Sequence, residues 1–184
     1  MNLEYTSQWF ILELRLTHND IEGVRYSLRV YYIPSSENIL QRTKEVNYAI
    51  DAIKSCDPFA VGSRYRNEVK HALEDVGWSG KVNLEHDSKR YIDGIFNDVG
   101  LVVQLGHKGA ATSYFLNLEY MYVTGKINSA IFVTQTKDHA VKRYQRSNPE
   151  SNSDGNYCTM DRIISDFELF SNFLTCPICI IAIE

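Results

Sequence analysis

Short runs of branched and aromatic residues alternate with longer amphipathic segments along the chain, and this alternation limits the folds open to it. Four such runs cover 91–96, 99–106, 129–135 and 176–183, and Asn97-Asp98 joins the first two. Short runs of this composition are typical of strands, and an Asn-Asp pair suits a tight turn. The pattern predicts an α/β (α+β) domain in which helices flank a central mixed sheet.

Four longer segments repeat their apolar residues at helical spacing. In the segment 64–76, the residues Tyr65, Val69, Leu73 and Val76 fall on one face, and the charged residues are expected to face elsewhere. Amphipathic helices of this kind cover the faces of a sheet. The other three segments are 37–55, with Ser36 as its N-cap, 112–124 and 159–174.

The polar stretch between about 136 and 157 has no clear apolar period. We expect it to form one long loop, since polar segments without periodicity rarely form regular elements. Loops of this length are usually functional or disordered. The stretch is therefore a candidate binding segment.

Two further runs near the N-terminus, 8–16 and 24–33, predict a β-hairpin. The chain has 184 residues, 44% of them hydrophobic, which suits one globular domain with a substantial core. We therefore expect a single domain over 1–184, with the hairpin at about 8–33 and the remaining core at about 36–184.

Charge and hydropathy restrict the expected cellular location of the protein and the class of its binding partner. No stretch approaches the ~20 apolar residues that a membrane helix needs. Glu4 stands where a signal peptide would carry basic charge, so a cytoplasmic location without membrane contact is expected. The net charge of −4 argues against a nonspecific polyanion binder, but a nuclease with local basic segments remains compatible with it.

The four cysteines show neither a disulfide framework nor a second pair at metal spacing. Cys176 and Cys179 form a C-x-x-C motif, which can be redox-active where it opens a helix after a strand. Here Pro177 lies inside the motif and several isoleucines follow, so the motif is predicted to open a strand. We expect reduced, structural thiols.

Three positions on the hairpin 91–106 indicate chemistry. Asp93 is followed nine residues later by Val102 and two residues further by Gln104. Side chains two apart on a strand share a face, so positions 102 and 104 project together and Asp93 can reach the same space. This pattern resembles the active-site hairpin of BglII/BstYI-type type II restriction endonucleases, in the PD-(D/E)XK nuclease superfamily, where it is Asp, Glu and Gln.

The resemblance spans about residues 36–184. Besides the hairpin, it rests on Asp57-Pro58, the following helix ending at Trp78, the passage from strand to loop at 130–139, Pro149-x-Ser151-Asn152-Ser153, and the closing helix and strand. The resemblance implies a restriction-endonuclease-like fold and a part in a restriction-modification system. It also implies cleavage of double-stranded DNA at a short palindrome, with GATC as the expected centre.

For the site, the resemblance implies Mg²⁺ held by Asp93 and an acidic residue at position 102, beside the scissile phosphate. Gln104 would hydrogen-bond the attacking water. Val102 has no oxygen to offer a metal, so cleavage is expected to be lost or strongly slowed. Three explanations stay open: an inactivated enzyme, natural or engineered; another carboxylate, best Glu68, in its place; or a resemblance of structure alone.

The resemblance also implies a DNA-reading surface and a homodimer, because a palindrome is read most simply by two-fold symmetry. Part of the segment 112–124 or of 37–55 is expected to form the dimer contact. Basic residues would bind phosphates, and amide and hydroxyl groups would read base edges. The expected DNA-binding residues are His107, Lys108, Lys137, His139, Arg143, Arg146, Asn152 and Ser153.

Two other functions remain open. A noncatalytic DNA-binding module on the same scaffold would bind its site whether or not Mg²⁺ is present. A small α/β domain engaged only in protein contacts would suit the acidic net charge. Failure to shift any duplex in low salt would favour the second of these.

Overall fold

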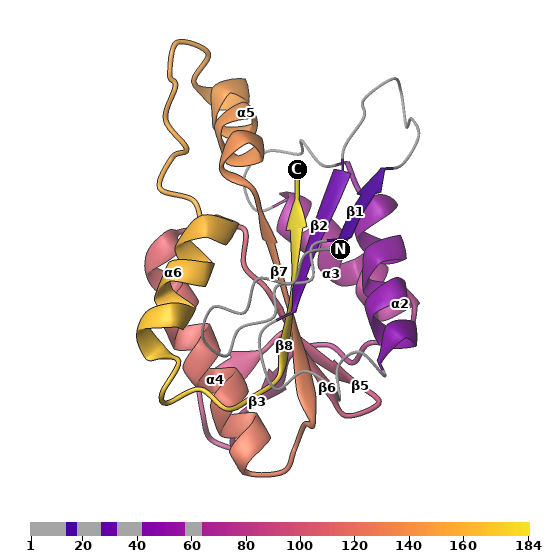
Figure 1. Cartoon of the computed structure of the whole chain (residues 1–184). Coiled ribbons are helices and arrows are strands. Elements are labelled where there is room, and N and C mark those ends of the chain that lie inside the picture. Colours follow the sequence, from indigo (N-terminus) through magenta and orange to yellow (C-terminus); the bar gives the residue numbers. More distant parts are fainter. Residues whose placement is uncertain (1–13, 18–26, 33–41, 58–63) are drawn as a thin grey trace, which may run out of the picture.

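The computed structural model describes residues 14–17, 27–32, 42–57 and 64–184. A mixed sheet crosses the molecule, with α2 and α3 on one face and α4 and α6 on the other (Figure 1). This confirms the predicted fold class. The helices are α2 Thr43–Lys54, α3 Arg64–Asp75, η1 Lys108–Ala110, α4 Ala111–Val123, α5 Lys137–Ser147 and α6 Met160–Phe170. The strands are β1 Leu14–Thr17, β2 Ser27–Tyr32, β3 Val82–Asn83, β4 Tyr91–Ile92, β5 Gly94–Phe96, β6 Val99–Val103, β7 Ser129–Gln135 and β8 Ile178–Ile183.

The strand order in the main sheet is β1-β2-β8-β7-β6-β5. Strands β6, β7 and β8 run parallel, while β2 and β5 pair antiparallel on either side of them. Every residue of β6, β7 and β8 is buried. Helices cover both faces of parallel strands, which explains why these segments read as continuous apolar runs.

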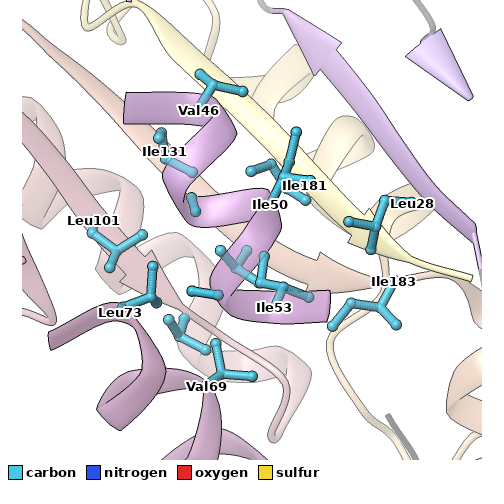
Figure 2. Packing of buried hydrophobic residues seen from close by; sticks show 14 of the residues in the cluster. Leu28, Val46, Ile50, Ile53, Val69, Leu73, Leu101, Ile131, Ile181 and Ile183 are labelled. Carbon is cyan, nitrogen blue, oxygen red and sulfur yellow. The ribbon is translucent and has the colours of Figure 1, made fainter. Parts of the chain in front are cut away.

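The two faces of the sheet carry separate hydrophobic clusters. On one face, Ile50 and Ile53 of α2 and Leu73 of α3 lie over Ile131 and Ile181 of the sheet (Figure 2). The opposite face carries Phe115, Phe132 and Phe167, with ring centroids of Phe115 and Phe132 5.0 Å apart. Each fully buried side chain of this size contributes roughly 1.5–3 kcal/mol through removal of its surface from water.

The predicted loop between 136 and 157 was wrong in its first half, because Lys137–Ser147 forms α5. Thr136 caps this helix, its hydroxyl accepting a hydrogen bond from the His139 N–H. The buried stripe of α5 consists of His139, Ala140 and Arg143. Two of these three residues are polar, so the helix leaves no apolar period in the sequence.

Other predictions need smaller corrections. The predicted stripe of α3 holds for Tyr65, Val69 and Leu73, but Val76 follows the helix and is 36% exposed. Strands β1 and β2 pair antiparallel, as the predicted hairpin requires, and β2 also joins β8. The proposed cap Ser36, the first residues of the segment 37–55 and the rest of the hairpin lie outside the described residues.

The cysteines match the prediction of reduced, structural thiols. All four are free and buried, and burial raises the pKa of Cys56 to about 11 and of Cys158 to about 12. Burial likewise raises the pKa of Cys176, which lies just before β8, and of Cys179, which lies inside it. A buried thiol with a raised pKa is a poor nucleophile, so the C-x-x-C motif belongs to strand packing.

In the described part of the chain, none of the helices has the length and apolarity needed to span a membrane.

Candidate functional site

The hairpin forms as predicted. Asn97 and Asp98 take φ values of 47° and 62° between β5 and β6, a left-handed pair that suits a two-residue hairpin turn. Gly94 lies opposite Leu101, and Asp93 occupies the bend between β4 and β5. The hairpin thus brings Asp93 to the C-terminal end of β6, where Val102 and Gln104 lie.

The carboxylate of Asp93 is fully buried and hydrogen-bonded to the adjoining strand. Its Oδ2 accepts a hydrogen bond from the Val103 N–H at 2.8 Å, and its own N–H donates to the Leu101 carbonyl at 2.8 Å. The side chain therefore continues the hydrogen bonding of β6 just before β5 begins. This role alone would account for an aspartate at this position.

Two cations of α3 bind the other oxygen of the same carboxylate. Lys70 forms an ion pair with Oδ1 of Asp93, and Nη2 of Arg66 lies 3.4 Å from that oxygen. Arg66 and Lys70 are four residues apart, hence on one face of α3. Both lie outside the buried stripe of α3, as predicted for its charged residues, but their contact with Asp93 was not predicted.

Arg66 also forms hydrogen bonds to two other parts of the chain. Its Nε donates to the Val103 carbonyl at 3.0 Å and its Nη2 to the Tyr114 hydroxyl at 3.1 Å. Burial by itself would lower the pKa of Arg66, but the Asp93 carboxylate and the tyrosine hydroxyl outweigh it, and the pKa is raised. Arg66 thus remains a cation that joins α3, β6 and α4.

Val102 lies in the apolar core. It is 0% exposed and belongs to the cluster under α4 and α6, together with Ile92 and its cross-strand neighbour Phe132. Gln104 is buried at the end of the same strand, and its Nε2 donates to the His107 carbonyl at 3.1 Å. The backbone of the His107 segment therefore engages one end of this amide.

Glu68 lies away from the Asp93 contacts. Its Oε1 accepts a hydrogen bond from Nε of Arg64 at 2.7 Å, a contact exposed to solvent. Glu68 stands two residues from both Arg66 and Lys70, so it projects from a different side of α3. The helix presents cations, not a carboxylate, to Asp93.

These positions do not fit a Mg²⁺ ion. The ion needs several oxygen ligands that are not already neutralised, but Asp93 is bound by two cations and Val102 offers no oxygen. Across the described residues, no group of three or more His, Cys, Asp or Glu side chains is placed to hold a metal. No chemical step through a metal can be built from this donor set.

The predicted DNA-binding residues divide into exposed and buried sets. The exposed residues lie at the start of η1, on α5 and in the segment after α5, and α5 with the segment after it projects past the end of β7 (Figure 1). His139 and Arg143 point inward from α5 instead, at 0% and 3% exposure. The exposed set is His107, Lys108, Lys137, Arg146, Asn152 and Ser153.

Arg143 binds to groups inside the protein. Its Nη1 donates to Oε1 of Gln135 at 2.7 Å, and its guanidinium lies 5.4 Å and 5.2 Å from the ring centroids of Tyr65 and Tyr157. Burial lowers its pKa. Arg143 therefore anchors α5 against the ends of the sheet.

This difference between Arg143 and Arg146 is testable. Arg143→Met should lower the free energy of unfolding by about 1.5 kcal/mol, because it removes buried hydrogen bonds and ring contacts. Arg146→Met, from the exposed surface of the same helix, should change stability by less than about 0.5 kcal/mol. Urea unfolding measures both. Equal effects would contradict the anchoring role.

Arg66, Lys70 and Lys81 were missed as candidate site residues. The available signal was a pair of cations four apart, alongside the apolar stripe of α3. Lys81 lies just before β3 with its Nζ 4.3 Å from the ring centroid of Tyr91. Nothing in the sequence links these cations to Asp93, because the pairing is tertiary.

Comparisons with known proteins give matches over the part of the chain that contains this site. A family model described as restriction endonuclease BglII/BglIII matches residues 28–183, so the match starts within β2, upstream of the predicted boundary at 36. A crystal structure of restriction endonuclease BglII complexed with a DNA 16-mer is similar, with a TM-score of 0.65 and 10% identity over 84% of this chain and 77% of that one. No curated protein matches. At this identity the structural likeness shows the fold alone.

Proposed function

Because the chain belongs to the BglII/BglIII restriction endonuclease family, we propose that it binds a short palindrome in duplex DNA as a homodimer without cutting it. The fold is that of a type II restriction endonuclease. The expected centre of the palindrome is GATC. Such a protein would keep the DNA recognition of a restriction endonuclease but not its cleavage, because Val102 stands where an acidic residue is expected.

One observation carries the proposal that cleavage is lost. The Asp93 carboxylate is buried under Lys70 and Arg66, and Val102 is part of the apolar core. Metal-dependent cleavage requires an ion that polarises the phosphate and activates water, and it loses orders of magnitude in rate without one. Binding does not depend on that step, so DNA affinity can survive.

Support for DNA binding comes from the surface near α5. His107, Lys108, Lys137 and Arg146 are exposed there, followed by Asn152 and Ser153. The cations suit phosphates, and the amide and hydroxyl groups suit base edges. The net charge of −4 makes such a local basic surface the expected place for a polyanion to bind.

The dimer contact is proposed on α4. Leu116, Tyr120 and Val123 are 49%, 36% and 64% exposed, and their spacing of four and three residues places them on one side of that helix. On α2, the other helix considered, Val46, Ile50 and Ile53 are buried against the sheet. The exposed apolar side of α4 is thus the better candidate for contact with a second copy.

Replacing Leu116 and Val123 together with glutamate should convert the dimer to a monomer, because burying two unpaired charges at a two-fold contact costs several kcal/mol. The matched control is Leu169→Glu, at a residue 72% exposed on α6. Sedimentation velocity measures the mass of each. A monomeric unaltered chain, or a dimer that survives the double substitution, would rule out this contact.

The proposed function is tested by selecting bound duplexes from a random-sequence pool at low salt. The expected result is enrichment of one palindrome, with GATC at its centre. Enrichment of another palindrome would keep the DNA-binding proposal and correct the site. No retained duplex in low salt would reject it in favour of a domain engaged only in protein contacts.

A further inference from the structure

A cluster of positive charge surrounds Tyr91, outside the surface assigned to DNA above. The Nζ atoms of Lys81 and Lys70 lie 4.3 Å and 5.9 Å from its ring centroid. The hydroxyl of Tyr114, which accepts a hydrogen bond from Arg66, lies 3.5 Å from that of Tyr91. Three cations and two hydroxyl groups therefore gather at one place beside the hairpin.

The positive charge of this cluster faces the solvent. The side chains of Arg66 and Lys70 are 27% and 24% exposed, and Lys81 is exposed, whereas Asp93 is fully buried beneath them. One carboxylate cannot balance three cations, so the surface carries excess positive charge. The Tyr114 hydroxyl, and after it the Arg66 charge, lower the pKa of Tyr91 despite its partial burial, as a positive potential should.

Hydrogen-bond donors remain available at this surface. The contacts of Arg66 to Asp93, Val103 and Tyr114 use its Nε and Nη2, and the side chain remains 27% exposed to solvent. The lysine ammonium groups and the Tyr91 hydroxyl add further donors. Donors of this kind around a positive centre bind phosphate oxygens.

We propose that Arg66, Lys70 and Lys81 form a phosphate seat that takes a phosphodiester of the bound duplex without a metal ion. The inference rests on the proposed DNA binding and adds a second contact region at the hairpin. The side-chain cations neutralise the phosphate charge. They also repel a divalent cation, so Mg²⁺ should add nothing to affinity.

The test uses the full chain and a fluorescein-labelled 30-base-pair duplex that carries the selected palindrome. Lys81→Gln removes one cation at an exposed position. Lys44→Gln is the matched control, because Lys44 is also exposed and lies over a tyrosine ring, with its Nζ 5.5 Å from the centroid of Tyr48 on α2. Anisotropy titrations are run at several salt concentrations, in EDTA and in MgCl₂ at equal ionic strength.

For Lys81→Gln we expect binding weaker by about five- to tenfold at low salt, and a slope of log K against log salt smaller by about 0.9, the value for one lost phosphate contact. Lys44→Gln should stay within about twofold of the unaltered chain, since it removes no phosphate contact. EDTA and MgCl₂ should give the same affinity. Thermal unfolding confirms that both variants fold.

Three results would overturn the seat. Equal binding by the two variants, with the unaltered chain binding normally, would place no phosphate at Lys81 while leaving the proposed function intact. Binding that needs Mg²⁺ would show that side chains alone do not neutralise the phosphate. No binding by the unaltered chain to any duplex would reject the proposed function, and the seat with it.

Discussion

Substituting Val102 with glutamate should lower the free energy of unfolding by about 4 kcal/mol and yield no nuclease, because it buries an unpaired carboxyl in a dry core. Val102 is 0% exposed and packs within the apolar cluster under α4 and α6. The substitution restores the family's acidic residue in name, but the Asp93 carboxylate stays bound to Lys70 and Arg66. Urea unfolding and a plasmid assay with Mg²⁺ measure the two effects.

The destabilisation of Val102→Glu should depend on pH in a defined direction. Burial raises the pKa of the new carboxyl above its unfolded value of about 4.3, so the folded state holds the proton to higher pH. Stability is then lost as pH rises from about 4.3 towards the folded pKa, and the free energy of unfolding of the variant should be lower at pH 8 than at pH 5.5.

Val102→Gln is the matched control for Val102→Glu. Glutamine has nearly the same size but no charge, so its effect should not change between pH 5.5 and 8 relative to the unaltered chain. A glutamate variant as stable as the unaltered chain, or one that cuts DNA, would show that position 102 can open towards the site. Either result would contradict the placement of Val102 in the core.

The second large effect is expected at Asp93. Replacing it with asparagine keeps an acceptor for the Val103 N–H but removes the charge that Lys70 and Arg66 share. Loss of one partner of a fully buried ion pair costs about 3–5 kcal/mol, and the partial exposure of both cations reduces the expected cost to about 2–3 kcal/mol. Chemical denaturation of the purified variant measures this loss.

Asp98→Asn provides the comparison for Asp93, because it makes the same change in the exposed turn of the same hairpin. It should alter stability by less than about 0.5 kcal/mol, since asparagine also tolerates a positive φ. A carboxylate kept available for a metal generally costs stability, and removing it leaves a protein equally or more stable. If Asp93→Asn behaves in that way, the ion pairs with α3 are not the reason for this aspartate.

Much of the fold could be predicted because burial leaves a period in the sequence. The run at 129–135 coincides with β7, and Tyr65, Val69 and Leu73 mark the buried stripe of α3. Asn97-Asp98 indicated the turn, because few residue pairs accept two successive positive φ values. These are local signals, and local rules are sufficient for them.

The features that sequence reasoning missed depend on contacts between distant residues. Helix α5 buries two polar residues, His139 and Arg143, and the burial of Arg143 is stabilised by Gln135 of β7 and not by apolar character. Arg66 meets Asp93 across 27 positions of the chain, and only the packing of α3 against the hairpin brings them together. With the same sequence, a different rotation of α3 about its axis would have brought Glu68 next to the Asp93 carboxylate.

The burial of Val102 bears on both the stability of the hairpin and the loss of cleavage. An apolar residue at this position extends the run of β6 into the core, and the two cations from α3 neutralise the one carboxylate that remains. An unpaired carboxylate in that position would carry a large desolvation cost. The hairpin is thereby stable without an ion, and the proposed seat gives the same cations a use in binding.

The most direct test is to incubate the unaltered chain with plasmid DNA that contains the selected palindrome, in Mg²⁺, and to resolve the products on a gel. We expect plasmid that is retarded by bound protein and returns intact after the protein is removed. Discrete linear fragments would contradict it, and their loss in Glu68→Gln would identify a carboxylate of α3 as the residue that replaced the one missing at position 102.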